Sequence, residues 1–251
     1  MTVKRVTIGL VVMISLALCC LSAFGGAELK PASIAETQKQ KITITKVYDF
    51  ACPWCYVSKR RLDQAMAQRP NIDFSINWIP FQLNPNMPRE GRNRWEYYRN
   101  KFGEESDKKI LEHHRRVGAG EDIAFCSDPE AMAPNTLAAH TLMYWGGQDP
   151  SVDTHVLAEK LYYSHHVACE NIGDHDVLVR IAGEVGMDTT IVAQKLAAGD
   201  DQARVKEQIN SVSSQGVRSV PYLVINNQYS MKGAQPVNAL LEVFDLVTKR
   251  P

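Results

Sequence analysis

Two cysteines separated by two residues, Cys52 and Cys55, are the residues whose type and spacing most plainly indicate chemistry. They follow an apolar, β-branched run that predicts a strand over 42–50, and they precede helical spacing over 56–69. A cysteine at such a junction lies at a helix N-terminus, where unpaired backbone N–H groups and the helix dipole favour the thiolate. The pair therefore predicts thiol–disulfide exchange, in which one exposed sulfur attacks and the other resolves the mixed disulfide.

Two other interpretations of the cysteine pair are open at this stage. The pair could be half of a zinc site, but the sequence lacks the second Cys-x-x-Cys or His-x-His cluster that would complete four ligands. It could also be a static disulfide, although so small a ring gains little from loop-closure entropy. Redox chemistry carried by the two sulfurs, with no metal and no cofactor, is favoured over both.

Residues 1–27 are interpreted as an export signal, with a basic start, an apolar run and small residues before residue 28. The apolar run up to Phe24 is also long enough for an uncleaved membrane anchor. Processing as a lipoprotein at Cys19 or Cys20 is disfavoured, because the residues before them are not the small ones that such processing prefers. An export signal places the protein in the periplasm or outside the cell, where disulfides persist.

Removal of residues 1–27 takes away two of the 28 basic residues and none of the 28 acidic ones, so the net charge becomes 26 − 28 = −2. This balance argues against nucleic acid or an anionic membrane surface as a partner. The remaining 251 − 27 = 224 residues suffice for one large domain or a domain with an insertion. Cys126 and Cys169 are candidates for a structural disulfide, with two buried free thiols as the alternative.

Strand signals lie towards the two ends of the chain and helix signals lie between them. A second strand is predicted over 73–79, helices over 131–145 (with Pro134 in the first turn), 152–167, 174–185 and 188–198, a hairpin over 220–231, and a last helix over 236–249. The order β-α-β, helices, α-β-β-α predicts an α/β domain divided by a helical insertion. The predicted divisions are a linker over 28–41, a first part over 42–91, the insertion over 92–199 and a second part over 200–251.

Several polar clusters are interpreted as solvated surface. Lys59, Arg60 and Arg61 point away from the face of the first helix that carries Cys55, which predicts a solvated basic face. The pairs His113–His114 and His165–His166 resemble metal ligands, but adjacent histidines on a helix point to different faces. We therefore expect them to face solvent.

The chain resembles the thioredoxin-fold proteins of the DsbA family, and more closely the FrnE-like branch of that family. The matching motifs are Asp49-Phe50-Ala51-Cys52-Pro53-Trp54-Cys55-Tyr56, Phe81-Gln82-Leu83-Asn84-Pro85, Asn135-Thr136 with His140, Gly216-Val217-Arg218-Ser219-Val220-Pro221, and Gly233-Ala234-Gln235. They span nearly all of residues 42–245 in the family's order. The resemblance implies a thioredoxin fold with an inserted all-helical domain.

The resemblance also implies roles for individual residues. Cys52 would be the nucleophile and Cys55 the resolving thiol, and Val220-Pro221 would be a cis-proline loop that faces them and binds substrate. A cis proline has no N–H and turns the chain so that the preceding backbone can pair with a substrate strand. Pro53 and Trp54 would tune the redox poise.

Two departures from the family pattern affect these roles. Trp54 replaces the histidine of the best-known periplasmic oxidants, and it carries no charge with which to stabilise a thiolate. Many thioredoxin-fold proteins have a buried acid six residues before the first cysteine, where this chain has Lys46. Asp49 is the candidate for proton handling instead, with a surface carboxylate at the strand end as the alternative.

The favoured function is an exported thiol–disulfide oxidoreductase that acts on cysteine-containing client proteins, together with a membrane redox partner that reoxidises it. The alternative is a glutathione-dependent isomerase or transferase, as in the related hydroxychromene-carboxylate isomerase and kappa-transferase group. The intact pair Cys52 and Cys55 and the export signal argue against that alternative. A binding module or chaperone without catalysis is disfavoured by the same pair.

Overall fold

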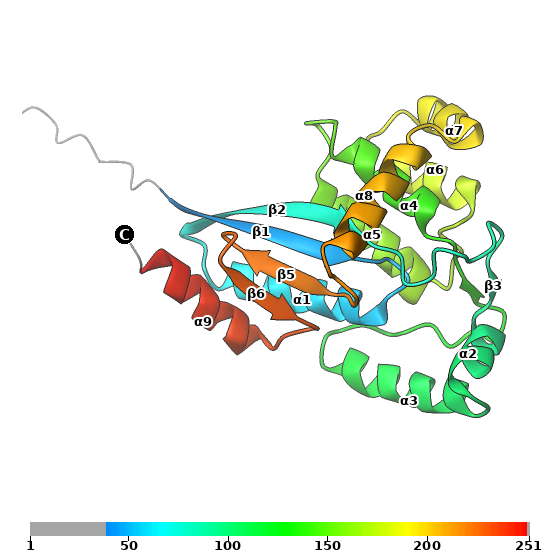
Figure 1. Ribbon diagram of the computed structural model, residues 1–251, viewed down its shortest axis with the longest axis horizontal. Helices are drawn as coiled ribbons and strands as arrows, with labels where there is room; N and C mark the ends of the chain where they lie inside the picture. The colour runs from blue at the N-terminus through cyan, green and yellow to red at the C-terminus, as the bar shows by residue number, and fades with distance from the viewer. Residues whose placement is uncertain (1–38, 250–251) are drawn as a thin grey trace, which may run out of the picture. The chain divides into compact units, whose positions relative to one another are not determined.

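The computed structural model describes residues 39–249, and its elements are labelled in Figure 1. The predicted export signal, and most of the predicted linker, lie outside the described residues. Within residues 39–249, every helix is too short or too polar to cross a membrane.

A four-stranded sheet with the order β2-β1-β5-β6 forms the base of the fold. Strand β1 (Gln40–Tyr48) pairs in parallel with β2 (Ile72–Pro80) and antiparallel with β5 (Tyr222–Ile225). Strand β6 (Tyr229–Lys232) closes the hairpin with β5. The turn between them contains Asn226 and Asn227 with φ of 49° and 56°, a conformation that asparagine tolerates better than most residues. The sheet order and its flanking helices are those of a thioredoxin fold.

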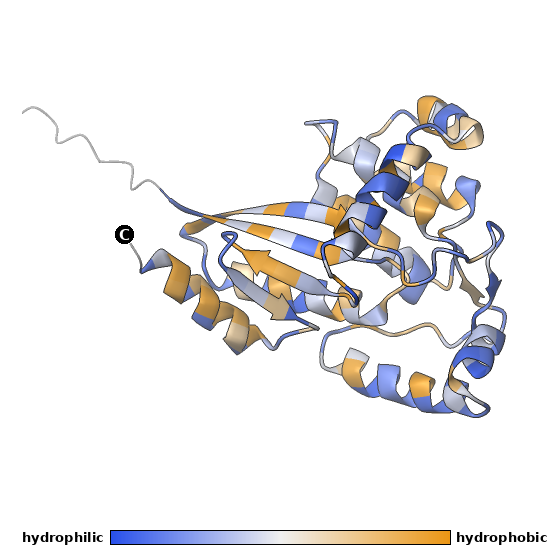
Figure 2. Cartoon of the chain, in the orientation of Figure 1, coloured by the Kyte–Doolittle hydropathy of each residue, from blue (hydrophilic) through white to orange (hydrophobic). Residues whose placement is uncertain are grey.

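One face of the sheet is buried against α1 (Pro53–Ala67) and α9 (Val237–Thr248). The alternation of strand β1 explains this burial, because Ile42 and Ile44 point to the same face and are both 0% exposed. Figure 2 shows the matching hydrophobic character of β5 and of much of α9. Helix α8 (Gln202–Ser214) precedes β5 and contacts β2 and α4.

The segment between β2 and α8 is mainly helical. Its helices are α2 (Arg94–Phe102), α3 (Ser106–Ala119), α4 (Leu137–Gly146), α5 (Thr154–His166), α6 (His175–Glu184) and α7 (Thr189–Ala198). Side chains of Asp153, Asp174 and Asp188 accept backbone N–H bonds at the N-termini of α5, α6 and α7, which fixes where these helices begin. The sequence did not reveal a short pair of strands, β3 (Arg92–Asn93) and β4 (Met132–Ala133), that ties the start of α2 to the segment before α4.

Two predicted boundaries were wrong. The first strand ends at Tyr48 rather than at residue 50, because a turn follows in which the N–H of Cys52 donates to the carbonyl of Asp49 at 3.1 Å. The helix predicted over 131–145 begins only at Leu137, because Met132 and Ala133 pair with β3. Pro134 therefore precedes this helix and is not in its first turn.

Candidate active site

Cys52 is the N-cap residue of α1, with Pro53 in the first helical turn. A proline is tolerated there because its missing N–H would have no partner within the helix. The Cys52 Sγ lies 3.7 Å from the carbonyl oxygen of Val220, and the Val220–Pro221 peptide bond is cis. The fold thus brings the turn after β1 and the loop before β5 together at one point. Both active-site cysteines are free thiols.

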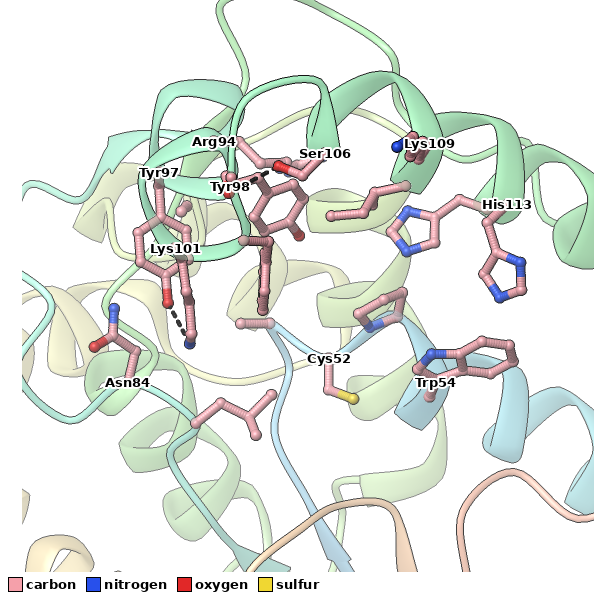
Figure 3. A pocket seen from close by; sticks show the side chains of 18 of the residues that line it. Cys52, Trp54, Asn84, Arg94, Tyr97, Tyr98, Lys101, Ser106, Lys109 and His113 are labelled. Atoms are coloured by element: carbon pink, nitrogen blue, oxygen red, sulfur yellow. Dashed lines mark hydrogen bonds between the residues drawn. The ribbon is translucent and has the colours of Figure 1, made fainter.

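The two sulfurs of the pair occupy different environments. Cys52 is 4% exposed and forms part of the wall of a cavity of about 990 Å³, whereas Cys55 is 0% exposed and lies behind it. The expectation of an exposed Cys52 was therefore wrong: Cys52 is nearly buried and lines the cavity together with Trp54 (Figure 3). Burial raises the pKa of Cys55 well above its usual value, and the neighbouring Cys52 raises it further.

Helices α2 and α3 form the far side of this cavity and cover Cys52 (Figures 1 and 3). Tyr97, Tyr98 and Phe102 of α2 give the wall an aromatic surface, and His113 of α3 packs on Trp54 with ring centroids 5.3 Å apart. Sequence reasoning missed this cover. The cluster of aromatic residues over 95–102 was the available signal, but nothing local indicated that it would lie over the cysteine.

Asp49 is 1% exposed, so the interpretation as a surface carboxylate is wrong. Its Oδ2 accepts the N–H of Leu83 at 2.8 Å, and its Oδ1 accepts the N–H of Ala51 at 3.3 Å. The Nε2 of His140, itself 1% exposed, lies 3.3 Å from Oδ1. The carboxylate therefore joins the turn before Cys52 to the segment after β2 and to α4.

Lys46 is a buried charged residue that acts on Cys55, and the sequence analysis assigned it no role. Its side chain is 0% exposed, and its Nζ lies 3.4 Å from the backbone carbonyl oxygen of Cys55. The same nitrogen is 5.4 Å from the ring centroid of Trp78. Burial lowers the pKa of Lys46 to about 8, a change that nearby Cys55 and Asp63 partly oppose.

The predicted solvated basic face on α1 was wrong for Lys59, which is 2% exposed. Its Nζ lies 2.9 Å from Oδ2 of Asp63 and 3.0 Å from Oε2 of Glu159. Arg60 also pairs with Glu159, at 2.8 Å. Helix α5 supplies Glu159, so this side of α1 is an interface between two helices, which the sequence of α1 alone could not indicate.

The expectation that His165 and His166 face solvent was also wrong, because they are 3% and 4% exposed. The guanidinium of Arg94 donates to the backbone oxygen of His165 at 3.1 Å, and Nε2 of His166 lies 2.8 Å from the backbone oxygen of Phe50. Desolvation lowers the pKa of both histidines well below the usual value. His113 is exposed as expected, while half-buried His114 has its pKa lowered to about 4 by burial.

Cys126 and Cys169 form a disulfide with a Cα–Cα distance of 5.4 Å. The bond joins the segment after α3 to the segment after α5. The backbone N–H of Cys126 also donates to the carbonyl of His166 at 2.6 Å. The cover over Cys52 is therefore fastened to α5 by a covalent bond and a hydrogen bond.

The sheet order, the cysteine pair at the start of α1 and the cis proline beside it identify the protein as a member of the thioredoxin-fold class. The family model of the DSBA-like thioredoxin domain matches residues 43–245, and the chain belongs to that family. Its place in the FrnE-like branch stays a prediction. No curated protein matches the sequence significantly.

Solved structures agree with the fold. A probable DsbA oxidoreductase from Streptomyces coelicolor has 21% identity and a TM-score of 0.74, with 84% of this chain and 92% of that chain covered. A 2-hydroxychromene-2-carboxylate isomerase has 12% identity and a TM-score of 0.62, over 82% and 96%. The cytosolic disulfide reductase DsbM from Pseudomonas aeruginosa, solved with GSH, has 14% identity and a TM-score of 0.58, over 83% and 100%.

Proposed function

We propose that this protein is an exported thiol–disulfide oxidoreductase that forms or exchanges disulfides in client proteins. The observation that carries the proposal is the asymmetry of the cysteine pair. Cys52 lies at the N-terminus of α1 with its sulfur at the cavity wall, and Cys55 lies behind it with no exposed surface. A nucleophile that substrate can reach and a resolving thiol that it cannot reach are what thiol–disulfide exchange requires.

In the oxidising direction, a client thiolate attacks the sulfur of Cys52 in the Cys52–Cys55 disulfide. The bond between the two cysteines breaks, a mixed disulfide forms, and Cys55 leaves with the electron pair. A second client thiolate then attacks the client sulfur of the mixed disulfide. Cys52 leaves as a thiolate facing the N–H groups of α1, and the client carries the new disulfide. A disulfide-bearing membrane protein is proposed to take the two electrons and restore the Cys52–Cys55 bond.

Val220 and Pro221 are proposed to bind the client backbone. The Val220 carbonyl lies 3.7 Å from the Cys52 sulfur, so an extended client segment that pairs with this backbone presents its own cysteine to Cys52. Pro53 and Trp54 line the same cavity and are proposed to tune the redox poise of the pair. Asp49, whose oxygens accept backbone N–H bonds and face His140, is proposed to position the turn that carries Cys52.

Export is proposed on two grounds. Residues 1–27 have the pattern of an export signal. The Cys126–Cys169 disulfide also suits an oxidising compartment such as the periplasm, where a bond of this kind persists.

The test uses two matched variants, each with Cys52 or Cys55 as the remaining thiol of the pair and each mixed with an unfolded client protein that carries disulfides, so that attack on a client disulfide supplies the mixed disulfide. Cys55→Ala keeps the nucleophile but removes the internal exit from the mixed disulfide, so covalent complexes should accumulate on a non-reducing gel. Cys52→Ala should form none, because the remaining sulfur is buried. Pro221→Thr in the Cys55→Ala background should slow the release of trapped client.

Equal trapping by Cys52→Ala and Cys55→Ala would contradict the assignment of roles. Failure of both variants to trap protein, combined with turnover of a glutathione-linked small molecule by the wild type, would identify the isomerase or transferase instead.

A further inference from the structure

Lys46 lies in a buried row of strand β1 whose other members are hydrophobic. Residues 42, 44, 46 and 48 point to the same face of the strand, because side chains alternate along it. Ile42, Ile44 and Tyr48 are buried at 0%, 0% and 1% exposure, and Lys46 is buried at 0% among them. A lysine ammonium in such a row costs free energy unless it is paired, so its presence calls for a reason.

The groups that surround Lys46 do not neutralise it. Within residues 39–249 no carboxylate oxygen lies within the 4.0 Å ion-pair distance of its Nζ, and its one hydrogen bond is the 3.4 Å contact with the Cys55 carbonyl. The acid that acts on Lys46 is Asp63 of α1, which Lys59 binds at 2.9 Å and which His155 of α5 binds at 2.7 Å.

The remaining charged and titratable neighbours can also be accounted for. Lys59 of α1 carries a like charge that lowers the pKa of Lys46, and it is itself paired with Asp63 and Glu159. Strand β2 contributes the uncharged ring of Trp78. Cys55 raises the pKa of Lys46 more than Asp63 or Cys52 does, and it has no ion pair of its own among the described residues.

We propose that Lys46 is the acid–base partner of Cys55, accepting the thiol proton when Cys55 resolves a mixed disulfide and returning it when Cys55 is released as a leaving group. This proposal rests on the proposed function, since it describes the resolving half of the same exchange. Lys46 does not touch the client. It acts through Cys55, by holding the proton that the Cys55 thiol loses and regains.

Atoms and charges balance in each direction. In resolution, the neutral amine of Lys46 takes the proton of the Cys55 thiol and becomes an ammonium. The Cys55 thiolate then attacks Cys52 Sγ, the Cys52–client bond breaks, and the client leaves as a thiolate. In the oxidising direction a client thiolate attacks Cys52, Cys55 leaves with the electron pair of the broken bond, and the Lys46 ammonium protonates it.

The electrostatics of the pair agree with this exchange. Burial lowers the pKa of Lys46 to about 8, so a neutral amine is accessible near neutral pH, which is not true of an exposed lysine. Burial raises the pKa of Cys55 well above its usual value, and the charge of Lys46 opposes that rise. A buried thiol without such a partner would remain protonated and would resolve mixed disulfides slowly.

Stopped-flow reaction of the mature protein with 5,5′-dithiobis(2-nitrobenzoate) tests the proposal, with the Cys52–Cys55 pair reduced and the Cys126–Cys169 disulfide intact. The first thionitrobenzoate anion reports attack by Cys52, at a rate that depends on reagent concentration. The second reports intramolecular attack by Cys55, at a rate that does not. Lys46→Met is the main variant, because methionine suits a buried row of apolar side chains. Lys41→Met, at an exposed position of the same strand, is the matched control.

We expect Lys46→Met to slow the second phase by at least about tenfold at neutral pH and to move its pH midpoint upward, while the first phase stays within about twofold of wild type. Lys41→Met should change neither phase. Lys46→Arg keeps the positive charge but offers no neutral amine at these pH values, so it should also be slow.

Each other outcome has a definite meaning. An unchanged second phase in Lys46→Met, or equal slowing of both phases, would overturn the role of Lys46. Recovery of the wild-type rate by Lys46→Arg would overturn proton acceptance. Absence of a second phase from the wild type itself would instead refute the proposed function, because Cys55 would then not act as the resolving thiol.

Discussion

Removal of the Cys126–Cys169 disulfide should destabilise the protein by an amount that its loop length sets. The two cysteines are 43 residues apart in sequence. In the chain-entropy model, a cross-link that closes a loop of this length removes about 13 cal/mol/K of entropy from the unfolded chain, which is about 4 kcal/mol at 25 °C. The double variant Cys126→Ala/Cys169→Ala should therefore lose about 4 kcal/mol of unfolding free energy.

Urea unfolding followed by circular dichroism measures this loss. Both proteins should also carry Cys52→Ser and Cys55→Ala, so that the active-site pair cannot contribute a second disulfide or form a wrong one. A loss below about 1 kcal/mol would refute the reasoning, because it would mean that the bond does not restrict the unfolded chain as the chain-entropy model requires. A local readout complements this measurement: with the active-site pair intact, the double variant should alkylate Cys52 faster, since the cover formed by α2 and α3 is less firmly held.

Three further changes test other parts of the structure by urea unfolding. Lys46→Met should add about 3 kcal/mol of unfolding free energy below pH 8, because there the wild type buries an ammonium whose pKa burial lowers from the ordinary 10.5 to about 8. Between pH 8 and 10.5 the wild type takes up a proton when it unfolds, so its own stability rises with pH and the gain should fade. A gain that does not vary with pH would contradict this. Asp49→Ala should cost about 2 kcal/mol of unfolding free energy, because two backbone N–H groups lose their acceptor. An altered pH–rate profile without that cost would contradict a purely structural role and support the predicted proton handling by Asp49. Gly118→Ala should cost about 1–3 kcal/mol of unfolding free energy, because the new Cβ would overlap the Ile123 carbonyl oxygen. Gly120→Ala is the control: the nearest atom to its Cβ is 3.6 Å away, so it should cost much less.

The parts of the site that the sequence predicted are those encoded locally. The spacing of Cys52 and Cys55 after a strand and before a helix was enough to place a sulfur at a helix N-terminus. The apolar, β-branched run before Cys52 was enough to predict strand β1, although not where it ends. In both cases the neighbours along the chain decide the outcome, and so the pattern carries the information.

The residues that were misjudged are those whose environment comes from distant segments. Lys59 is buried because α5 brings Glu159 against it. His166 is buried at a place where its Nε2 lies next to the backbone oxygen of Phe50. No spacing within α1 or α5 contains that information. The same holds for the cover over Cys52, which depends on how α2 and α3 are docked rather than on their own periodicity.

The Cys126–Cys169 disulfide in the helical segment has to form before the protein is complete, so this protein needs a disulfide-forming step of its own. Residues 39–249 contain four cysteines, which allow three ways of pairing all of them. The two pairings that are not observed would each tie Cys52 to a cysteine of the helical segment and would remove the nucleophile from use. A newly synthesised chain must therefore have Cys126 joined to Cys169 while Cys52 and Cys55 stay available to each other. Mature copies of the same protein could perform that step, so the supply of active protein would depend on the active protein already present.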